Sequence, residues 1–276
     1  MVYIVDMRSS KEQSQENKII EALEKLGVSE KVLNATKMLT ADEEVQAIQE
    51  YANNVSIVRL GFNDHGPVHM RTVALNGIIM LGLLREAGIK TSLETEGVGD
   101  FEDSLLAVIF ASVLHDLGMS IGRQDHEIHS AYLSSPILDR LLLAVYRDNL
   151  QKKVMTRSLA LECISGHMGS RAIHSLEAGV VQVADGCDMT KGRARIPLVL
   201  HTQKTGTIHQ VSANSIDEVK LSRGQDKPIN IKVIMSSEVG LFQVEEVLLT
   251  KIAASTAKPH IELYAVVHGG EPKRYL

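Results

Sequence analysis

The sequence is poor in cysteine and has no excess of positive charge. Its 276 residues include only two cysteines, Cys163 and Cys187, and neither lies in a CxxC pair. There is thus almost no material for a disulfide framework or a thiolate zinc site, and we expect reduced, buried thiols. The net charge of -5 at pH 7 supplies no basic field that would capture nucleic acid non-specifically. A polymeric nucleic acid partner is therefore disfavoured.

The sequence also predicts no signal peptide and no membrane-spanning segment. The first residues, MVYIVDMRSSKEQ, contain no basic stretch followed by a long apolar one. No later run is expected to supply the roughly 20 apolar residues that a membrane span requires. We expect a cytoplasmic protein with no membrane partner. Its 44% hydrophobic and 23% charged residues are ordinary for a globular chain long enough for one large domain and a smaller one.

Hydrophobic periodicity predicts helices over most of the first two hundred residues. Ser29 and Thr40 are expected to be N-caps, and Pro67 is suited to the first turn of a helix. Two segments are apolar nearly all round and are therefore expected to be central, one from Pro67 to Gly88 and one from Phe101 to Gly118. The other segments predicted to be helical are 12–26, those following Ser29 and Thr40, 125–148, 152–165 and 173–190.

The pattern changes after Pro197, where β-branched residues and partial alternation predict strands over 207–221 and 228–237. A helix over 239–255 and a strand over 260–267 complete a small unit. We therefore expect a mainly α protein with a small C-terminal α+β unit. The expected division is an N-terminal helical extension over 1–50, a helical domain over 51–200 and the α+β unit over 201–276.

The most informative motif is SVLHDLG, in which His115 and Asp116 are adjacent at the end of an apolar helix. An unpaired buried carboxylate costs several kcal/mol, so something positive must lie near Asp116. One interpretation is structural: His115 caps the helix and Asp116 pairs with an arginine such as Arg123. The other is that both residues bind a metal ion.

Further imidazoles and a carboxylate favour the metal. The chain contains 11 histidines, and His69, His126, His167 and Asp185 each lie at or near the end of an otherwise apolar segment. This ligand mixture suits zinc, manganese, iron or nickel, whereas calcium would require more oxygen. Any one of these histidines alone could be a hydrogen-bonded core residue. Taken together, they predict a metal site.

The order H, HD, H, H, D resembles the HD superfamily of metal-dependent phosphohydrolases. HDLGMSIGRQDHEIHSA is similar to the HD-x-G segment of that family and the helix that follows it, which favours His126 over His129 as a ligand. VQVADGCDMTKGR is similar to the closing segment of the family. The resemblance covers roughly residues 60–195 and is far more specific than the HD pair alone. It implies an HD-type helical bundle over 51–200.

The resemblance also implies a ligand set and an activity. His69, His115, Asp116 and Asp185 would bind a first ion, and His126 and His167, with the bridging Asp116, would bind a second. The expected ions are Mn, Fe, Ni, Co or Zn, with Mg also compatible. Water activated by metal would attack a phosphomonoester or phosphodiester of a small, nucleotide-like molecule. The residues expected to be catalytic are Asp116, His126 and His167, the last two binding metal or else orienting phosphate and protonating the leaving oxygen.

Substrate contacts are less defined by sequence. Many relatives carry lysine directly after HD-x-G, whereas this chain has Met119 there. A cation near the substrate phosphate is therefore either missing or supplied from elsewhere in the chain. His65 is either a metal ligand or substrate contact, or a residue that caps a turn. The candidate cations are Arg123, Lys191, Arg193 and Arg195, although the KGRAR stretch could simply be a solvated helix end. The HHE and GYP segments of the branch that cleaves cyclic dinucleotides are absent.

Two other functions stay open at this stage. Helical HD-type bundles with two irons can also activate oxygen, which would make the protein an oxygenase. Alternatively, the metal centre could be regulatory or part of a binding module without turnover, as Met119 would favour. We expect a homo-oligomer, with the C-terminal unit pairing subunits or sensing a ligand.

Overall fold

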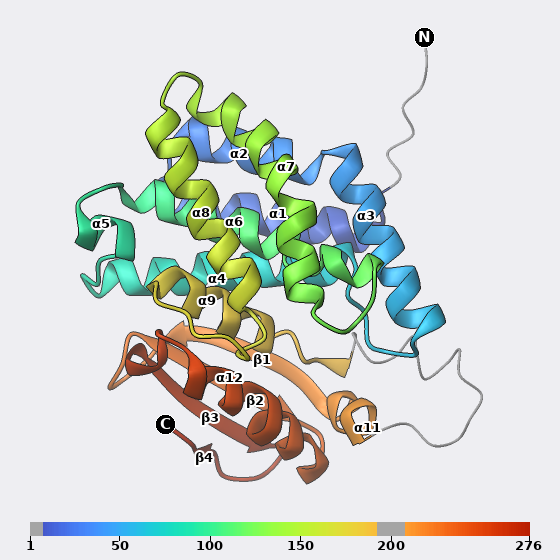
Figure 1. Ribbon diagram of the computed structural model, residues 1–276. Helices are drawn as coiled ribbons and strands as arrows, with labels where there is room; N and C mark the ends of the chain where they lie inside the picture. The colour runs from blue at the N-terminus through green and yellow to red at the C-terminus, as the bar shows by residue number, and fades with distance from the viewer. Residues whose placement is uncertain (1–7, 192–207) are drawn as a thin grey trace.

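The computed structural model describes residues 8–191 and 208–276, which form a mainly helical protein with a C-terminal four-stranded mixed sheet (Figure 1). The predicted mainly α fold with a C-terminal α+β part is confirmed. Before the undescribed segment 192–207, the helices are α1 (Ser10–Lys25), α2 (Glu30–Thr40), α3 (Glu43–Asn54), the π-helix η1 (Val55–Arg59), α4 (Pro67–Glu86), α5 (Ser92–Glu96), α6 (Phe101–Leu114), the 3-10 helix η2 (Leu117–Ser120), α7 (His126–Tyr146), α8 (Leu150–Gly166) and α9 (Leu176–Gly186).

Helix starts follow local capping chemistry, with one correction to the sequence prediction. Ser29 is the N-cap of α2, and Pro67 is the first residue of α4, as expected. Thr40, expected to be an N-cap, is instead the last residue of α2. Asp42 caps α3, because its carboxylate accepts the Val45 backbone N–H at 3.1 Å. Two acidic residues then follow in the first turn of α3, where they suit the helix dipole.

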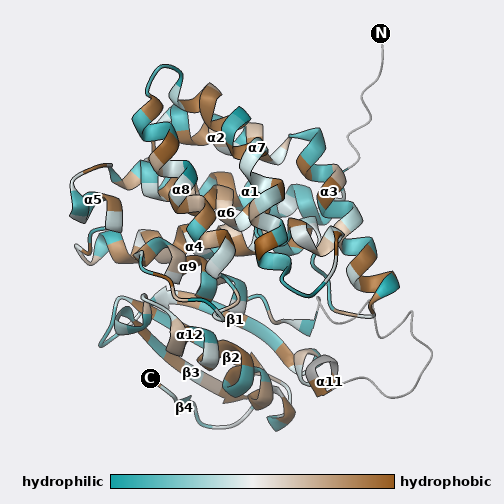
Figure 2. Ribbon diagram, viewed as in Figure 1, coloured by the Kyte–Doolittle hydropathy of each residue, from teal (hydrophilic) through white to brown (hydrophobic). Residues whose placement is uncertain are grey.

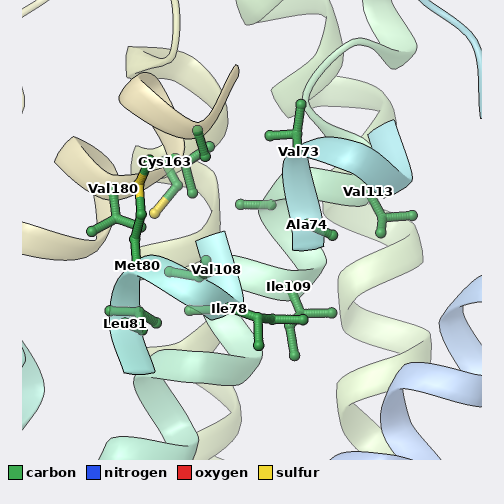
Figure 3. Close-up of a cluster of buried hydrophobic side chains, with 14 of the residues drawn as sticks. Val73, Ala74, Ile78, Met80, Leu81, Val108, Ile109, Val113, Cys163 and Val180 are labelled. Atoms are coloured by element: carbon green, nitrogen blue, oxygen red, sulfur yellow. The ribbon is translucent and has the colours of Figure 1, made fainter. Parts of the chain in front are cut away.

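The centre of the helical part is α6, all of whose residues are buried except Glu102, which is half-buried. Its near-continuous hydrophobic sequence is visible in Figure 2. Figure 3 shows its side chains packed against those of α4, α8 and α9, among them Val108 and Ile109 beside Ile78. This core fixes the relative positions of the helix ends, because close-packed side chains resist displacement.

Among the residues that the structure describes, two helical segments are long and apolar enough to cross a membrane, Pro67–Glu86 and Phe101–Ser120. The expectation that no segment would reach this length and hydropathy was therefore wrong. The protein itself buries 67% of an apolar 18-residue stretch in the first segment and 94% of such a stretch in the second. This degree of burial is typical of core helices in a globular protein.

The C-terminal part contains α11 (Ile208–Asn214), β1 (Ile216–Arg223), β2 (Ile229–Met235), η3 (Glu238–Gly240), the π-helix η4 (Gln243–Leu248), α12 (Leu249–Ala254), η5 (Lys258–His260), β3 (Ile261–Val267) and β4 (Lys273–Arg274). The strand predicted over 207–221 is only partly right, because residues 208–214 are helical. The short strand β4 was not predicted.

The strands lie in the order β1-β2-β3-β4. Strand β2 is antiparallel to β1 and parallel to β3, so η4 and α12 form the crossover between two parallel strands. Strand β2 alternates buried and half-buried residues along its length, which is the pattern of a strand with one covered face. The crossover helices cover that face, and their buried residues Val244, Leu248 and Ile252 belong to the same hydrophobic core.

Candidate metal centre

Five helices end or begin at one place in the molecule. His69 lies in the first turn of α4, His115 is the C-cap of α6, His126 is the first residue of α7 and His167 is the C-cap of α8. Asp116 follows His115 directly, and Asp185 is the penultimate residue of α9. All six side chains belong to residues that are 0% to 7% exposed. The structure therefore brings together the six residues that the sequence suggested as ligands.

The carboxylate of Asp116 lies between two groups of imidazoles. Its Oδ2 atom is 3.3 Å from Nε2 of His69 and 3.4 Å from Nε2 of His115. Its Oδ1 atom is 3.2 Å from Nε2 of His126 and 3.5 Å from Nε2 of His167. Asp185 belongs to the first group, since its Oδ1 is 3.3 Å from Nε2 of His69. The centre thus has two halves joined by one carboxylate.

Each imidazole is fixed by its other nitrogen. His115 donates from Nδ1 to the Ser112 carbonyl at 2.8 Å, and His167 donates to the Ile164 carbonyl at 2.7 Å. His126 similarly faces the Arg123 carbonyl at 3.0 Å. A carbonyl oxygen can only accept, so a neutral ring carries its proton on Nδ1 and presents the lone pair of Nε2.

These lone pairs point at one another. Nε2 of His69 is 3.3 Å from Nε2 of His115, and Nε2 of His126 is 3.2 Å from Nε2 of His167. Two acceptor nitrogens at such a distance cannot satisfy each other, and placing their lone pairs face to face in a buried site costs free energy. A cation in each half would satisfy them. The donor set therefore fits divalent metal ions on the chemistry of these residues alone.

Charge and burial act together on the titrating groups. Burial works to raise the pKa of Asp116, but the surrounding imidazoles, His115 first, hold that pKa well below its usual value. For Asp185, burial again works to raise the pKa, and the Lys251 ammonium holds it well below the usual value. Burial lowers the pKa of His167 to about 4. Both carboxylates are thus ionised and His167 is neutral at neutral pH, as metal ligation requires.

Two further residues support the first half of the centre. His69 donates from Nδ1 to Oδ2 of Asp188 at 2.6 Å, so Asp188 orients the ring of a candidate ligand. His65 lies with its ring 5.9 Å from that of His69, centroid to centroid. Its own Nδ1 is 2.6 Å from the Asn63 carbonyl and 2.8 Å from the Ser56 hydroxyl.

A cavity of about 540 Å³ opens directly onto the centre. Asp116 and Asp185 line it from the metal side, and its walls combine apolar side chains with polar and charged ones. The wall residues contributed by the helical part include Leu60, Phe62, His65, Arg123, Met168 and Met189. Those from the C-terminal part are Ala213, Gln243, Glu246, Val247, Thr250 and Lys251.

The structure places some of the predicted substrate-binding residues on the cavity wall and others away from it. His65 and Arg123 line the cavity, and Nη1 of Arg123 lies 3.4 Å from Nε2 of His126. Lys191 is not part of the cavity wall, and its ammonium pairs with Asp217 of β1 at 2.7 Å. Arg193 and Arg195 lie outside the described residues.

Lys251 of α12 is the cation that sequence reasoning missed. Its ammonium pairs with Oδ2 of Asp185 and donates to the His167 carbonyl at 3.1 Å. It follows Asp185 by 66 positions in the chain. The only sequence signal was Met119, which is fully buried and stands where the phosphohydrolases that the motif resembles often have lysine.

Within residues 8–191 and 208–276, the buried groups that could hold a metal ion are His69 with His115 and Asp185, and His115 with Asp116 and His167. In each group the candidate ligand atoms lie within 4.8 Å of one another. His126 extends the second group through its Nε2, which faces Oδ1 of Asp116. Imidazole with carboxylate suits a divalent transition metal better than calcium.

Comparison with known proteins gives one informative result. No family model matches the chain, and no solved structure matches it. The chain is 41% identical over 234 residues to the uncharacterized protein MJ1020 of Methanocaldococcus jannaschii, an alignment that covers 85% of this chain and 88% of that protein. The name of that relative assigns no activity. On this identity and coverage, the chain belongs to the same protein family as the Methanocaldococcus jannaschii protein.

Proposed function

We propose that the protein is a metal-dependent phosphohydrolase of the HD type, acting on a small phosphomonoester or phosphodiester. The observation that carries this proposal is the arrangement around Asp116, whose two carboxylate oxygens each face a pair of imidazole Nε2 atoms. A carboxylate that bridges two groups of ligands is what a two-metal hydrolytic site requires. The likeness of the motif order to HD phosphohydrolases supports the same conclusion.

In this proposal the residues divide between two ions. His69, His115 and Asp185 would hold the first, His126 and His167 would hold the second, and Asp116 would contribute to both. Divalent ions held by these residues would lower the pKa of a bound water toward neutrality. The Arg123 guanidinium, on the cavity wall beside His126, binds a phosphate oxygen of the substrate. Asp188 keeps the His69 ring in the orientation that ligation needs.

The cavity supports a small, nucleotide-like substrate. Its volume of about 540 Å³ falls within the usual range for small-molecule sites. Leu60, Phe62 and Met168 offer apolar surface on which a flat group such as a base can lie, while the metal centre faces the phosphate. Glu246 on the same wall disfavours substrates with additional negative charge at that end.

The experiment is metal analysis of the purified protein together with an activity screen. Phosphomonoesters and phosphodiesters are tested with manganese, nickel, cobalt and magnesium, and release of phosphate or of the alcohol is measured. We expect at least one bound divalent ion per chain and turnover of a nucleotide-like ester. Asp116→Asn should lose both metal and turnover, because it removes the shared carboxylate charge.

The matched control is Asp139→Asn, which changes an exposed carboxylate on α7 that pairs with Lys153 and Arg157. It should retain metal and activity. Turnover that persists in Asp116→Asn would contradict the proposal. Strict iron dependence with oxygen consumption, and no ester cleavage, would instead assign the centre to an oxygenase. Bound metal without any turnover would favour a regulatory module.

A further inference from the structure

The C-terminal part contributes a positive charge to the metal centre. Lys251 lies on α12, and its side chain is only 11% exposed where it meets Asp185. The same side chain lines the cavity next to Asp116 and Asp185. A lysine ammonium is rarely this buried unless it has a specific partner. Its position therefore relates α12 directly to the chemistry of the helical part.

The contact between α9 and the end of α12 fixes this position. A Cβ atom at Gly179 of α9 would lie 2.2 Å from Oγ1 of Thr256 and 2.7 Å from the Ala257 backbone nitrogen. The two segments also exchange hydrogen bonds, because the Ser255 hydroxyl donates to the Gly179 carbonyl at 2.9 Å and the Thr256 hydroxyl donates to the Ser175 carbonyl at 2.6 Å. Such close approach leaves little freedom for the helix that carries Lys251.

The donors of the Lys251 ammonium are not all used within the protein. An ammonium group has three N–H donors. Among the described residues, one contacts Oδ2 of Asp185 and one contacts the His167 carbonyl. A third donor remains on a group that faces the cavity. A phosphate oxygen of a molecule bound there is the kind of acceptor that it would meet.

We propose that Lys251 binds the substrate phosphate, so that the catalytic site is shared between the helical part and the C-terminal part. This inference rests on the proposed phosphohydrolase function. Lys251 supplies from α12 the cation that is missing at Met119, whose side chain is fully buried. The C-terminal part is then a wall of the active site, in addition to any role in pairing subunits.

Lys251 could instead serve only to position Asp185, and this role predicts a different effect of its removal on metal binding. If the ammonium only holds Asp185 in place for the metal, its removal weakens metal binding. If it binds phosphate, its removal leaves metal binding unchanged or tighter, since a positive charge near the ions is lost, and weakens phosphate binding. Measurement of both affinities on one variant separates the two roles.

The experiment uses the full chain loaded with manganese and follows the binding of inorganic phosphate by calorimetry. Lys251→Met keeps the length of the side chain and removes the charge, and Lys251→Arg keeps the charge. We expect Lys251→Met to bind phosphate about ten- to a hundredfold more weakly and to retain manganese. Lys251→Arg should recover much of the phosphate affinity. Lys258→Met, which changes an exposed lysine in the same part of the chain, is the control and should match the wild type.

The wild-type protein provides a second measurement that does not depend on the folding of a variant. Phosphate should protect Lys251 from acetylation in the manganese-loaded protein, read by mass spectrometry, and should not protect Lys258. Unchanged phosphate affinity in Lys251→Met, loss of its manganese, or absence of protection would overturn the inference. These outcomes leave the proposed function intact, whereas a wild type that binds no metal would refute the proposed function itself.

Discussion

At the scale of single residues, the centre is built from imidazoles whose outer nitrogens are occupied by hydrogen bonds. Three of them use a carbonyl three residues earlier in the chain, as His115 does with Ser112. His69 differs, because its Nδ1 donates to the carboxylate of Asp188. A carboxylate behind a ligating imidazole raises the basicity of the ring and fixes its orientation. Asp188 should therefore matter to metal affinity although it is not a ligand.

Asp188→Asn tests this role. We expect metal affinity to fall by about 10- to 100-fold, because the amide accepts from the ring more weakly than the carboxylate does. Titration of the metal-free protein with manganese measures the change. Asp217→Asn is a matched control, since Asp217 also accepts from a histidine, His268, at 2.9 Å but on the exposed surface. Equal affinities in the two variants would exclude a supporting role for Asp188.

The six converging side chains were predictable from sequence because their types are rare in apolar segments and their order is specific. Lys251 was not predictable. Its segment reads as an ordinary amphipathic helix, and only the fold places it beside Asp185. Lys191, by contrast, follows Asp185 closely in the chain but pairs with Asp217. Proximity in sequence was therefore a poor guide to which cation faces the cavity.

At the scale of elements, the turn after α6 presents both halves of the centre. Gly118 lies between α6 and α7, and its N–H donates to the Ser130 hydroxyl at 2.8 Å. A Cβ atom at Gly118 would lie 2.1 Å from the His126 carbonyl oxygen and 2.6 Å from the Ser130 nitrogen. The glycine of the HD-x-G segment is thus required by close backbone approach, which brings His126 to Asp116.

Gly118→Ala should displace the start of α7 and with it His126. We expect a loss of stability of about 1–3 kcal/mol and a loss of metal from the half of the centre that contains His126. Denaturant unfolding and metal stoichiometry measure the two effects. Gly122→Ala is the control, because a Cβ atom there meets nothing within 4 Å. Full metal content in Gly118→Ala would show that the close approach does not position His126.

The sequence predicted the type of secondary structure correctly for long segments with a clear hydrophobic period. The prediction was wrong for short segments. Helix α11 was predicted as a strand because Ile208 and Val211 are β-branched, which favours strands over so short a segment. The N-cap of α3 was predicted to be Thr40, but it is Asp42. Both residue types are good N-caps, so the sequence alone does not distinguish them, whereas the backbone conformation does. Strand β4 has only two residues, which is too short for an alternating hydrophobic pattern that would predict a strand.

At the scale of the whole molecule, a cluster of buried imidazoles and carboxylates lies next to a densely packed core. Without cations, the Nε2 atoms of His69 and His115, and those of His126 and His167, face each other as pairs of acceptors, and the protein bears the cost of that repulsion. Ions that bind the folded chain and not the unfolded chain stabilise the fold by mass action. Metal content should therefore control global stability as well as activity.

Removal of metal by a chelator should lower the melting temperature, and added manganese should restore it. At a free ion concentration a thousandfold above the dissociation constant, the stabilisation is about 4 kcal/mol. Scanning calorimetry on chelated and metal-loaded protein measures it. Asp116→Asn serves as the reference and should show a much smaller shift. An equal shift in the two proteins would mean that the stabilising ions bind elsewhere.

The most direct test of the account is the location of metal in a crystal of the manganese-loaded protein, from anomalous scattering. The account predicts one peak on each side of the Asp116 carboxylate, the first among His69, His115 and Asp185 and the second between His126 and His167. Absence of any peak at this centre, with manganese present at saturating concentration, would contradict it.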